Sequence, residues 1–281
     1  MDGKKGSGDG NMANGRQISR RQMLGYCLAG AAGVALWRFR GRSGGEDAGN
    51  GTDSFAGGED ADSLTERLKE ELFGQGADLV GIGDLTTLPE RSRSRLPVGI
   101  CVAVKFPKEV VSGIVDMPTR EYYDSYNELN SSLYTITSHA VKKLKEWGYQ
   151  ATTQVSLPHK TVATRAGVGW VGRSNLLVTE SYGSMIRLGS ILTDAPLLTA
   201  EPVNESKCGD CMLCVDACPA AALTGKLWDT TVERDEILNT SKCSAMAVER
   251  SIAGFGIPIE LCGKCFAVCK YTRQYIEGGE A

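Results

Sequence analysis

Eight of the ten cysteines in this sequence of 281 residues lie within one stretch, between Cys208 and Cys269. The first four follow the pattern C-x2-C-x2-C-x3-C-P, and the other four are more widely spaced. The first pattern is typical of bacterial [4Fe–4S] proteins, in which closely spaced thiolates bind successive corners of an iron–sulfur cube. It matches zinc ribbons poorly, because their cysteine pairs are separated by longer segments. We therefore predict two [4Fe–4S] clusters that carry electrons.

The two predicted ligand sets interleave along the chain. In two-cluster proteins of this type, the fourth cysteine of the run binds the other cluster. One set is therefore expected to combine the first three cysteines of the run with the last one in the chain: Cys208, Cys211, Cys214 and Cys269. The other set combines the fourth cysteine of the run with the remaining three: Cys218, Cys243, Cys262 and Cys265.

Three glycines, Gly167, Gly169 and Gly172, spell G-x-G-x-x-G, the motif that joins a strand to a helix in dinucleotide-binding proteins. Here the preceding residues 159–166, HKTVATRA, do not form an apolar strand pattern. The following residues 173–183 indicate a strand and a turn where a helix is required. We therefore predict a tight turn whose backbone closely approaches a neighbouring group.

The elements that position these residues indicate an α/β (α+β) fold. A capping box at Ser63 and Glu66 predicts a helix over 63–73, and apolar residues at steps of three and four predict another over 126–147. Short apolar segments predict strands at 77–83, 98–106, 149–155, 175–179 and 185–194. We expect an α/β domain over 63–200 that holds cofactor and substrate, and a ferredoxin-like domain over 201–281.

The N-terminal segment carries an export pattern. Arg20 and Arg21 precede an apolar run, 23–37, that is shorter than the roughly 20 residues needed to span a bilayer. Residues 1–42 are therefore expected to be a twin-arginine signal, with possible membrane association, and 43–62 a disordered linker rich in Gly and Asp. A cytoplasmic location is the alternative. The net charge of −3 argues against DNA as a partner.

Taken together, the motifs resemble the epoxyqueuosine reductase family. The resemblance rests on HKTVATRAGVGWVGRSNLLVT, CGDCMLCVDACP, KCSAM and LCGKCFAVC, and it covers about 63–275. It implies a nitroreductase-like α/β domain that holds a corrinoid (cobalamin), and two [4Fe–4S] clusters that deliver electrons to it. An electron donor protein or another low-potential reductant would supply the clusters.

Three departures distinguish the sequence from that family. The family has a catalytic Asp shortly before the glycine turn, but no Asp or Glu occurs from Trp147 to Thr179. Lys270 follows the last cluster cysteine where the family has Pro, and the export pattern would separate the protein from tRNA. We therefore expect a small organic substrate and not tRNA. Two alternatives stay open: an electron-transfer protein without corrinoid, and a true epoxyqueuosine reductase acting on tRNA.

Candidate reactive residues come from the segment that lacks acids and from the start of the long helix. His159, Lys160 and Tyr126 are predicted to supply protons during reduction, because each carries a titratable N–H or O–H group. The structural alternatives are a surface turn after Pro158 and ordinary packing of the tyrosine. A further alternative is that the cations of this segment, Lys160 among them, hold an acidic cofactor tail or an anionic substrate. The turn and its flanking cations are predicted to bind the cofactor: Arg165, Gly167, Gly169, Trp170, Gly172 and Arg173.

Overall fold

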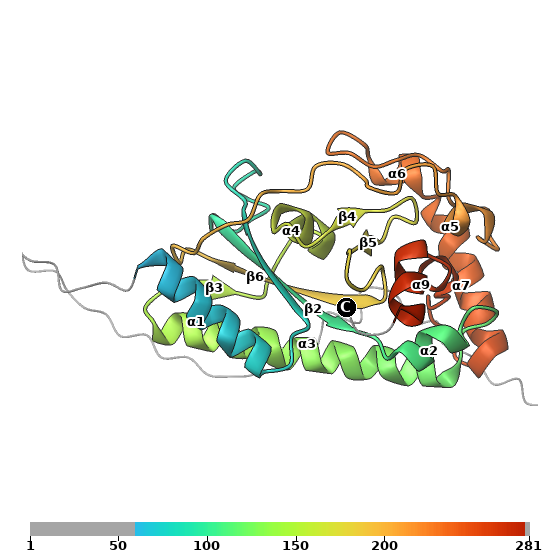
Figure 1. Ribbon diagram of the computed structural model, residues 1–281, viewed down its shortest axis with the longest axis horizontal. Coiled ribbons are helices and arrows are strands. Elements are labelled where there is room, and N and C mark those ends of the chain that lie inside the picture. Colours follow the sequence, from blue (N-terminus) through green and yellow to red (C-terminus); the bar gives the residue numbers. More distant parts are fainter. Residues whose placement is uncertain (1–59, 279–281) are drawn as a thin grey trace, which may run out of the picture. The chain divides into compact units, whose positions relative to one another are not determined.

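A four-stranded antiparallel sheet organises residues 60–278, the part of the chain that the computed structural model describes (Figure 1). The strands lie in the order β1-β2-β6-β3. Their bounds are β1 Leu79–Asp84, β2 Val98–Lys105, β6 Ile186–Thr193 and β3 Ala151–Thr152. The predicted signal segment and nearly all of the predicted linker lie outside the described residues.

Helices cover both faces of this sheet. On one face α1 (Ala61–Gly74) and α3 (Arg120–Glu146) pack against Ile100 and Val102 of β2. On the other face α4 (His159–Arg165) packs against Cys101 and Ala103, the alternate residues of the same strand. Figure 1 shows α4 above the sheet and the two longer helices below it. Because every second residue of a strand points to the opposite face, β2 is buried on both sides and its sequence is continuously apolar.

The C-terminal region consists mainly of short helices. Its helices are α5 Leu213–Asp216, α6 Arg234–Ile237, α7 Thr240–Phe255, α8 Lys264–Ala267 and α9 Lys270–Glu277. This region shares an aromatic core with the end of the sheet near α2 (Lys108–Gly113), where Phe106 lies 5.5 Å from Tyr122 and 5.9 Å from Phe266 between ring centroids. The predicted fold class, an α/β region followed by a cysteine-rich region, is confirmed.

Several predicted element boundaries are wrong. Asp60, and not Ser63, caps α1, because its carboxylate accepts the Ser63 backbone N–H at 2.8 Å. The predicted linker therefore ends before Ala61. Thr119 caps α3 in the same way, so that helix starts well before residue 126.

The structure also corrects the elements on both sides of the glycine turn. The residues after Pro158 form α4, whose apolar side chains are buried against the sheet, so the surface turn offered as the structural alternative for His159 and Lys160 is wrong. The segment predicted as a strand at 149–155 pairs with β6 only over β3. The strand predicted at 175–179 shortens to β5 (Leu177–Val178), which pairs with β4 (Trp170–Val171) in a small hairpin. Asn175 turns this hairpin with a left-handed φ of 59°.

The turn at Tyr182 and Gly183 fastens the end of the sheet to the C-terminal region. Gly183 has a φ of +57°, and a Cβ there would lie 2.2 Å from the backbone nitrogen of Thr272 in α9. We expect Gly183→Ala to lower the free energy of unfolding by about 2–4 kcal/mol, through backbone strain and a clash that neither segment can relieve. Gly148→Ala is the matched control, because Gly148 also has a positive φ but no atom lies within 4 Å of the added Cβ. Urea unfolding of both variants under anaerobic conditions measures the difference, and equal losses would contradict the proposed clash.

Within the described residues, no helix is both long and apolar enough to cross a membrane.

Candidate metal centres and the adjoining cavities

Four cysteines from two segments of the chain line one cavity at the start of the C-terminal region. They are Cys208, Cys211, Cys214 and Cys269, the first predicted ligand set. The first two lie in the loop before α5, the third lies in α5, and the last immediately precedes α9. This group is called the first cysteine cavity below.

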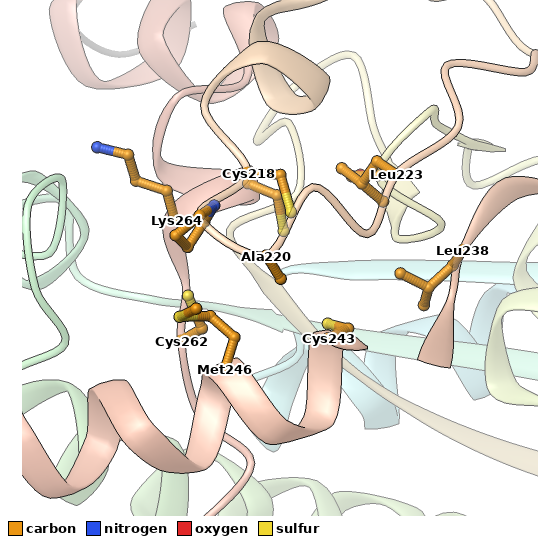
Figure 2. Close-up of a pocket in the computed structure, with 11 residues that line it drawn as sticks. Cys218, Ala220, Leu223, Leu238, Cys243, Met246, Cys262 and Lys264 are labelled. Carbon is orange, nitrogen blue, oxygen red and sulfur yellow. The ribbon is translucent and has the colours of Figure 1, made fainter. Parts of the chain in front are cut away.

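The other four cysteines line a second cavity, shown in Figure 2. Cys218 follows α5, Cys243 lies in the first turn of α7, Cys262 precedes α8, and Cys265 lies within α8. In Figure 2 the labelled Cys218, Cys243 and Cys262 reach the same space from three segments of the chain. Ser174 lines both this second cysteine cavity and the first, so the two are neighbours.

The grouping of these thiols into two sets of four suits two clusters. All nine cysteines among the described residues are free of disulfides. Each thiolate of a [4Fe–4S] cube binds a different iron, so its four ligands lie farther apart than the four ligands of one zinc ion. Two separate sets of four thiols therefore fit two cubes.

Burial makes four of these thiols weaker acids. Desolvation raises the pKa of Cys214 to about 12, and it also raises the pKa of Cys265, Cys243 and Cys269. Iron ligation requires thiolates, so cluster assembly would release protons. The positive charge of the iron would then stabilise the buried thiolates in place of water. Arg173 and Lys270 line the first cysteine cavity and Lys264 the second, which places positive charge beside each set.

The glycine motif is a helix end followed by a hairpin, and it supports the first cysteine cavity. Gly167 has a φ of +69° and ends α4: its N–H donates to Thr164 O, and the Val168 N–H donates to Ala163 O, as in a Schellman motif. At Gly172 a Cβ would lie 2.8 Å from a methyl group of Val178 and 3.4 Å from the Cys208 sulfur. The turn predicted to approach another group closely thus lies against β5 and a predicted cluster ligand.

The residues predicted to bind the cofactor do not all meet at one place. Gly172 and Arg173 line the first cysteine cavity. Gly167, Gly169 and Trp170 line a different hollow of about 250 Å³. The backbone of Arg165 lies against Gly83 of β1 instead. Two hydrogen bonds from Thr86 are the main cause that lowers the pKa of the neighbouring Asp84, and the charge of Arg165 lowers it further. Tertiary packing therefore separates residues that are close in sequence.

One further cavity adjoins the second cysteine cavity, and another cavity adjoins that one in turn. The aromatic cavity, of about 260 Å³, is lined by Phe106, Tyr122, Tyr126 and Phe266 and also by Cys243, Cys262 and Cys265. The cationic cavity, of about 190 Å³, is lined by His159, Lys160 and Arg187 among others. Four residues line both: Leu176, Ser184, Ile186 and Arg187. The predicted cluster ligands and the predicted proton donors therefore border one continuous region.

All three predicted proton donors line this region. The Lys160 ammonium donates to the backbone carbonyl of Asn175 at 3.0 Å and also to its side-chain oxygen, and burial lowers the pKa of Lys160 to about 8. His159 Nδ1 lies 3.0 Å from Ser190 Oγ, and desolvation, together with the charge of Arg187, lowers its pKa. At neutral pH Lys160 is therefore mostly protonated and His159 mostly neutral.

Arg187 is the main residue that the sequence reading missed. Its Nε and Nη2 donate to Asn130 Oδ1 at 3.0 and 2.9 Å, and its guanidinium lies 4.4 Å from the centre of the Tyr126 ring. A lone arginine within the apolar run MIRLGSILTD was the available signal. Two other polar groups were not predicted from the sequence. The buried hydroxyl of Ser184 has no hydrogen-bond partner among the described residues. Glu260 is the one described residue with a carboxylate that lines either cavity.

These features define an iron–sulfur protein with a cavity beside its second set of thiols, and comparison with known proteins agrees. Residues 207–272 match the family model of the 4Fe-4S double cluster binding domain. The epoxyqueuosine reductase of Cyclobacterium marinum is 34% identical over 122 residues, which cover 40% of this chain and 36% of that protein. The epoxyqueuosine reductase of Aliivibrio fischeri is 27% identical over 179 residues, covering 60% and 47%. The chain thus spans less than half of either relative.

Solved structures show the same fold. A catabolic reductive dehalogenase in complex with 3-bromo-4-hydroxybenzoic acid superposes with a TM-score of 0.63 at 18% identity, covering 76% of this chain and 32% of that one. An epoxyqueuosine reductase gives a TM-score of 0.53 at 19% identity, covering 75% and 66%. The resemblance to epoxyqueuosine reductases and their dehalogenase relatives is therefore confirmed.

Proposed function

We propose that this chain is an iron–sulfur reductase that passes electrons from the first cysteine cavity to the second and then to a small molecule beside it. One observation carries this proposal: Cys243, Cys262 and Cys265 line both the second cysteine cavity and the aromatic cavity. A cluster held there would lie next to bound substrate, which short-range electron transfer requires. The first cluster would receive electrons from a donor protein or another low-potential reductant.

We further propose that a corrinoid binds beside the second cysteine cavity and reaches into the aromatic cavity. The lining of the aromatic cavity is largely apolar with a few polar groups, as cofactor sites usually are, and the buried Ser184 hydroxyl lacks a hydrogen-bond partner among the described residues. Leu176, Ile186 and the aromatic side chains would enclose it. When bound, it would supply a cobalt centre able to accept electrons from the clusters and reduce a carbon-bound group. A reductive dehalogenase of similar fold, whose structure suggests a mechanism for B12-dependent dehalogenation, supports the choice of cofactor.

Lys160 is the best-suited proton donor of the three predicted residues. Its ammonium lines the cavity, and its lowered pKa, about 8, makes it a stronger acid than an ordinary lysine while leaving it protonated at neutral pH. Tyr126 contacts Arg187 and borders the same space, whereas His159 is mostly neutral and is better suited to accept a proton.

Two alternatives compete with a small-molecule reductase. The names of the curated relatives favour epoxyqueuosine reductase, and one related structure contains a tRNA stem loop. Against a tRNA substrate, the segment before the glycine turn contains no acid, and the N-terminal pattern supports export by the twin-arginine route. The other alternative is an electron carrier without corrinoid.

Iron and cobalt content separates these functions. The full chain, purified without air and supplied with cobalamin, is expected to contain about eight irons and one cobalt. The loaded protein is then tested with a dithionite-reduced donor on halogenated aromatic acids and, in parallel, on epoxyqueuosine-containing tRNA. Turnover of tRNA alone would replace the small-molecule proposal, and eight irons without cobalt would leave an electron carrier.

A further inference from the structure

The cationic cavity contains positive charge that no described carboxylate neutralises. Among the described residues, Lys160 is hydrogen-bonded only to the two oxygens of Asn175, a neutral residue. Arg187 is hydrogen-bonded to the neutral side chain of Asn130 and stacks on Tyr126. Neither cation forms an ion pair with a carboxylate anywhere in residues 60–278.

Two lysines elsewhere in the same fold form ion pairs with carboxylates. Lys105 lies 2.9 Å from Asp78, and Lys143 lies 3.2 Å from Glu71, although each of these lysines is still partly exposed. Residues 60–278 contain 27 acidic and 23 basic residues, so the described chain does not lack carboxylates that could pair with a cation. Burial of an unpaired ammonium is unfavourable, so two unpaired cations facing one cavity need a functional explanation.

We propose that the cationic cavity binds an oxyanion of the substrate, so that the substrate is a small organic acid carrying a carboxylate or phosphate group. Arg187 would supply the main contact, because its Nη1 has no hydrogen-bond partner among the described residues, and Lys160 would add a second positive charge. The assignment of this anion to a substrate rests on the proposed function, whereas binding of an anion in the cavity does not.

The arrangement of charge also orients such an acid. The cationic and aromatic cavities share four lining residues, and only the aromatic cavity borders Cys243, Cys262 and Cys265. Glu260 lines the aromatic cavity and accepts a hydrogen bond from the Ser244 hydroxyl, so its carboxylate would repel an anion there. The acidic group would therefore lie in the cationic cavity, near Arg187, and not beside Glu260.

Calorimetric titration of the iron-loaded, corrinoid-free full chain tests anion binding directly. Benzoate and inorganic phosphate are the probes, and benzyl alcohol is the neutral analogue of benzoate. We expect both anions to bind, the alcohol not to bind, and Arg187→Met and Lys160→Met each to weaken binding about tenfold or more. Lys145→Met, on the exposed face of α3, is the matched control and should leave affinity unchanged. Equal binding of the alcohol, absence of anion binding, or unchanged affinity in both cavity variants would overturn the proposal.

A second arm identifies the source of the anion, because cobalamin carries a phosphodiester tail that cobinamide lacks. Absorbance titrations of the same variants with both corrinoids are compared. If the substitutions leave both corrinoid affinities unchanged, the cavity is free for a substrate anion, which supports the proposal. If they weaken binding of cobalamin but not of cobinamide, the cavity serves the cofactor tail and the substrate proposal is wrong. If neither corrinoid binds to the wild-type chain, the proposed cofactor fails, and the anion titration still decides this inference.

Discussion

Cys218→Ser is expected to remove one iron–sulfur cluster and to leave the other intact, so that iron falls from about eight to about four per chain. Cys218 lies closer in sequence to Cys214 than to any cysteine of its own predicted set, yet the two residues line different cavities. A serine hydroxyl is a much weaker iron ligand than a thiolate, so the cluster that lacks the thiolate should be lost. Electron paramagnetic resonance after dithionite reduction, together with iron analysis, gives the result.

Two further variants make the assignment specific. Cys218→Ser combined with Cys243→Ser should lose no more iron than either single variant, because both residues belong to one predicted set. Cys101→Ala is the control for cysteine replacement, since Cys101 is buried in β2 away from both cysteine cavities and should keep about eight irons. Complete loss of iron in the double variant would show that Cys218 and Cys243 bind different clusters.

Removal of iron is expected to unfold residues 207–227 and to loosen the rest of 207–272, while the sheet stays folded. Three helices of this region, α5, α6 and α8, have only 4 residues each, which is too short for independent stability. The apolar core around 207–243 is small: it consists of Ala222, Leu223 and Leu238, with cysteines packed against them, whereas Phe266 packs into the aromatic core shared with the sheet. The sheet and its helices form a much larger buried core that contains none of the predicted ligands.

Hydrogen exchange measured by mass spectrometry tests this difference region by region. After anaerobic chelation, amide protection in 207–227 should fall at least about 100-fold, as expected for a local loss of roughly 3 kcal/mol. Protection in β2 and β6 should change little, and α9 should keep part of its protection through Thr272, which accepts the Ser184 N–H at 3.0 Å. Restoring iron and sulfide is the control for reversibility. A uniform loss of protection would contradict a separate role for the clusters.

The sequence and the structure agree best where the chemistry depends on local spacing. Cys208, Cys211 and Cys214 must reach one cube from one short loop, so their spacing alone indicates the cluster type. The residues around the glycine motif argue against nucleotide binding, because no apolar strand precedes it and no helix follows it. The structure agrees, since α4 precedes the motif and the β4–β5 hairpin follows. Helix starts were less predictable, because Asp and Ser side chains can both cap the N-terminus of a helix. In α1 the carboxylate of Asp60 is the cap and accepts the backbone N–H of Ser63.

The sequence by itself determined the iron–sulfur chemistry of this protein and its family resemblance, because these depend on residue types at short, fixed separations, and it predicted the interleaving of the cysteine sets. Only the tertiary structure brought Arg187 of β6, Lys160 of α4 and the second cysteine set to adjoining cavities. It also moved Arg165 away from them, against β1. The physical reason is that strand register and helix packing decide toward which cavity a side chain points, and both depend on contacts between residues far apart in the chain.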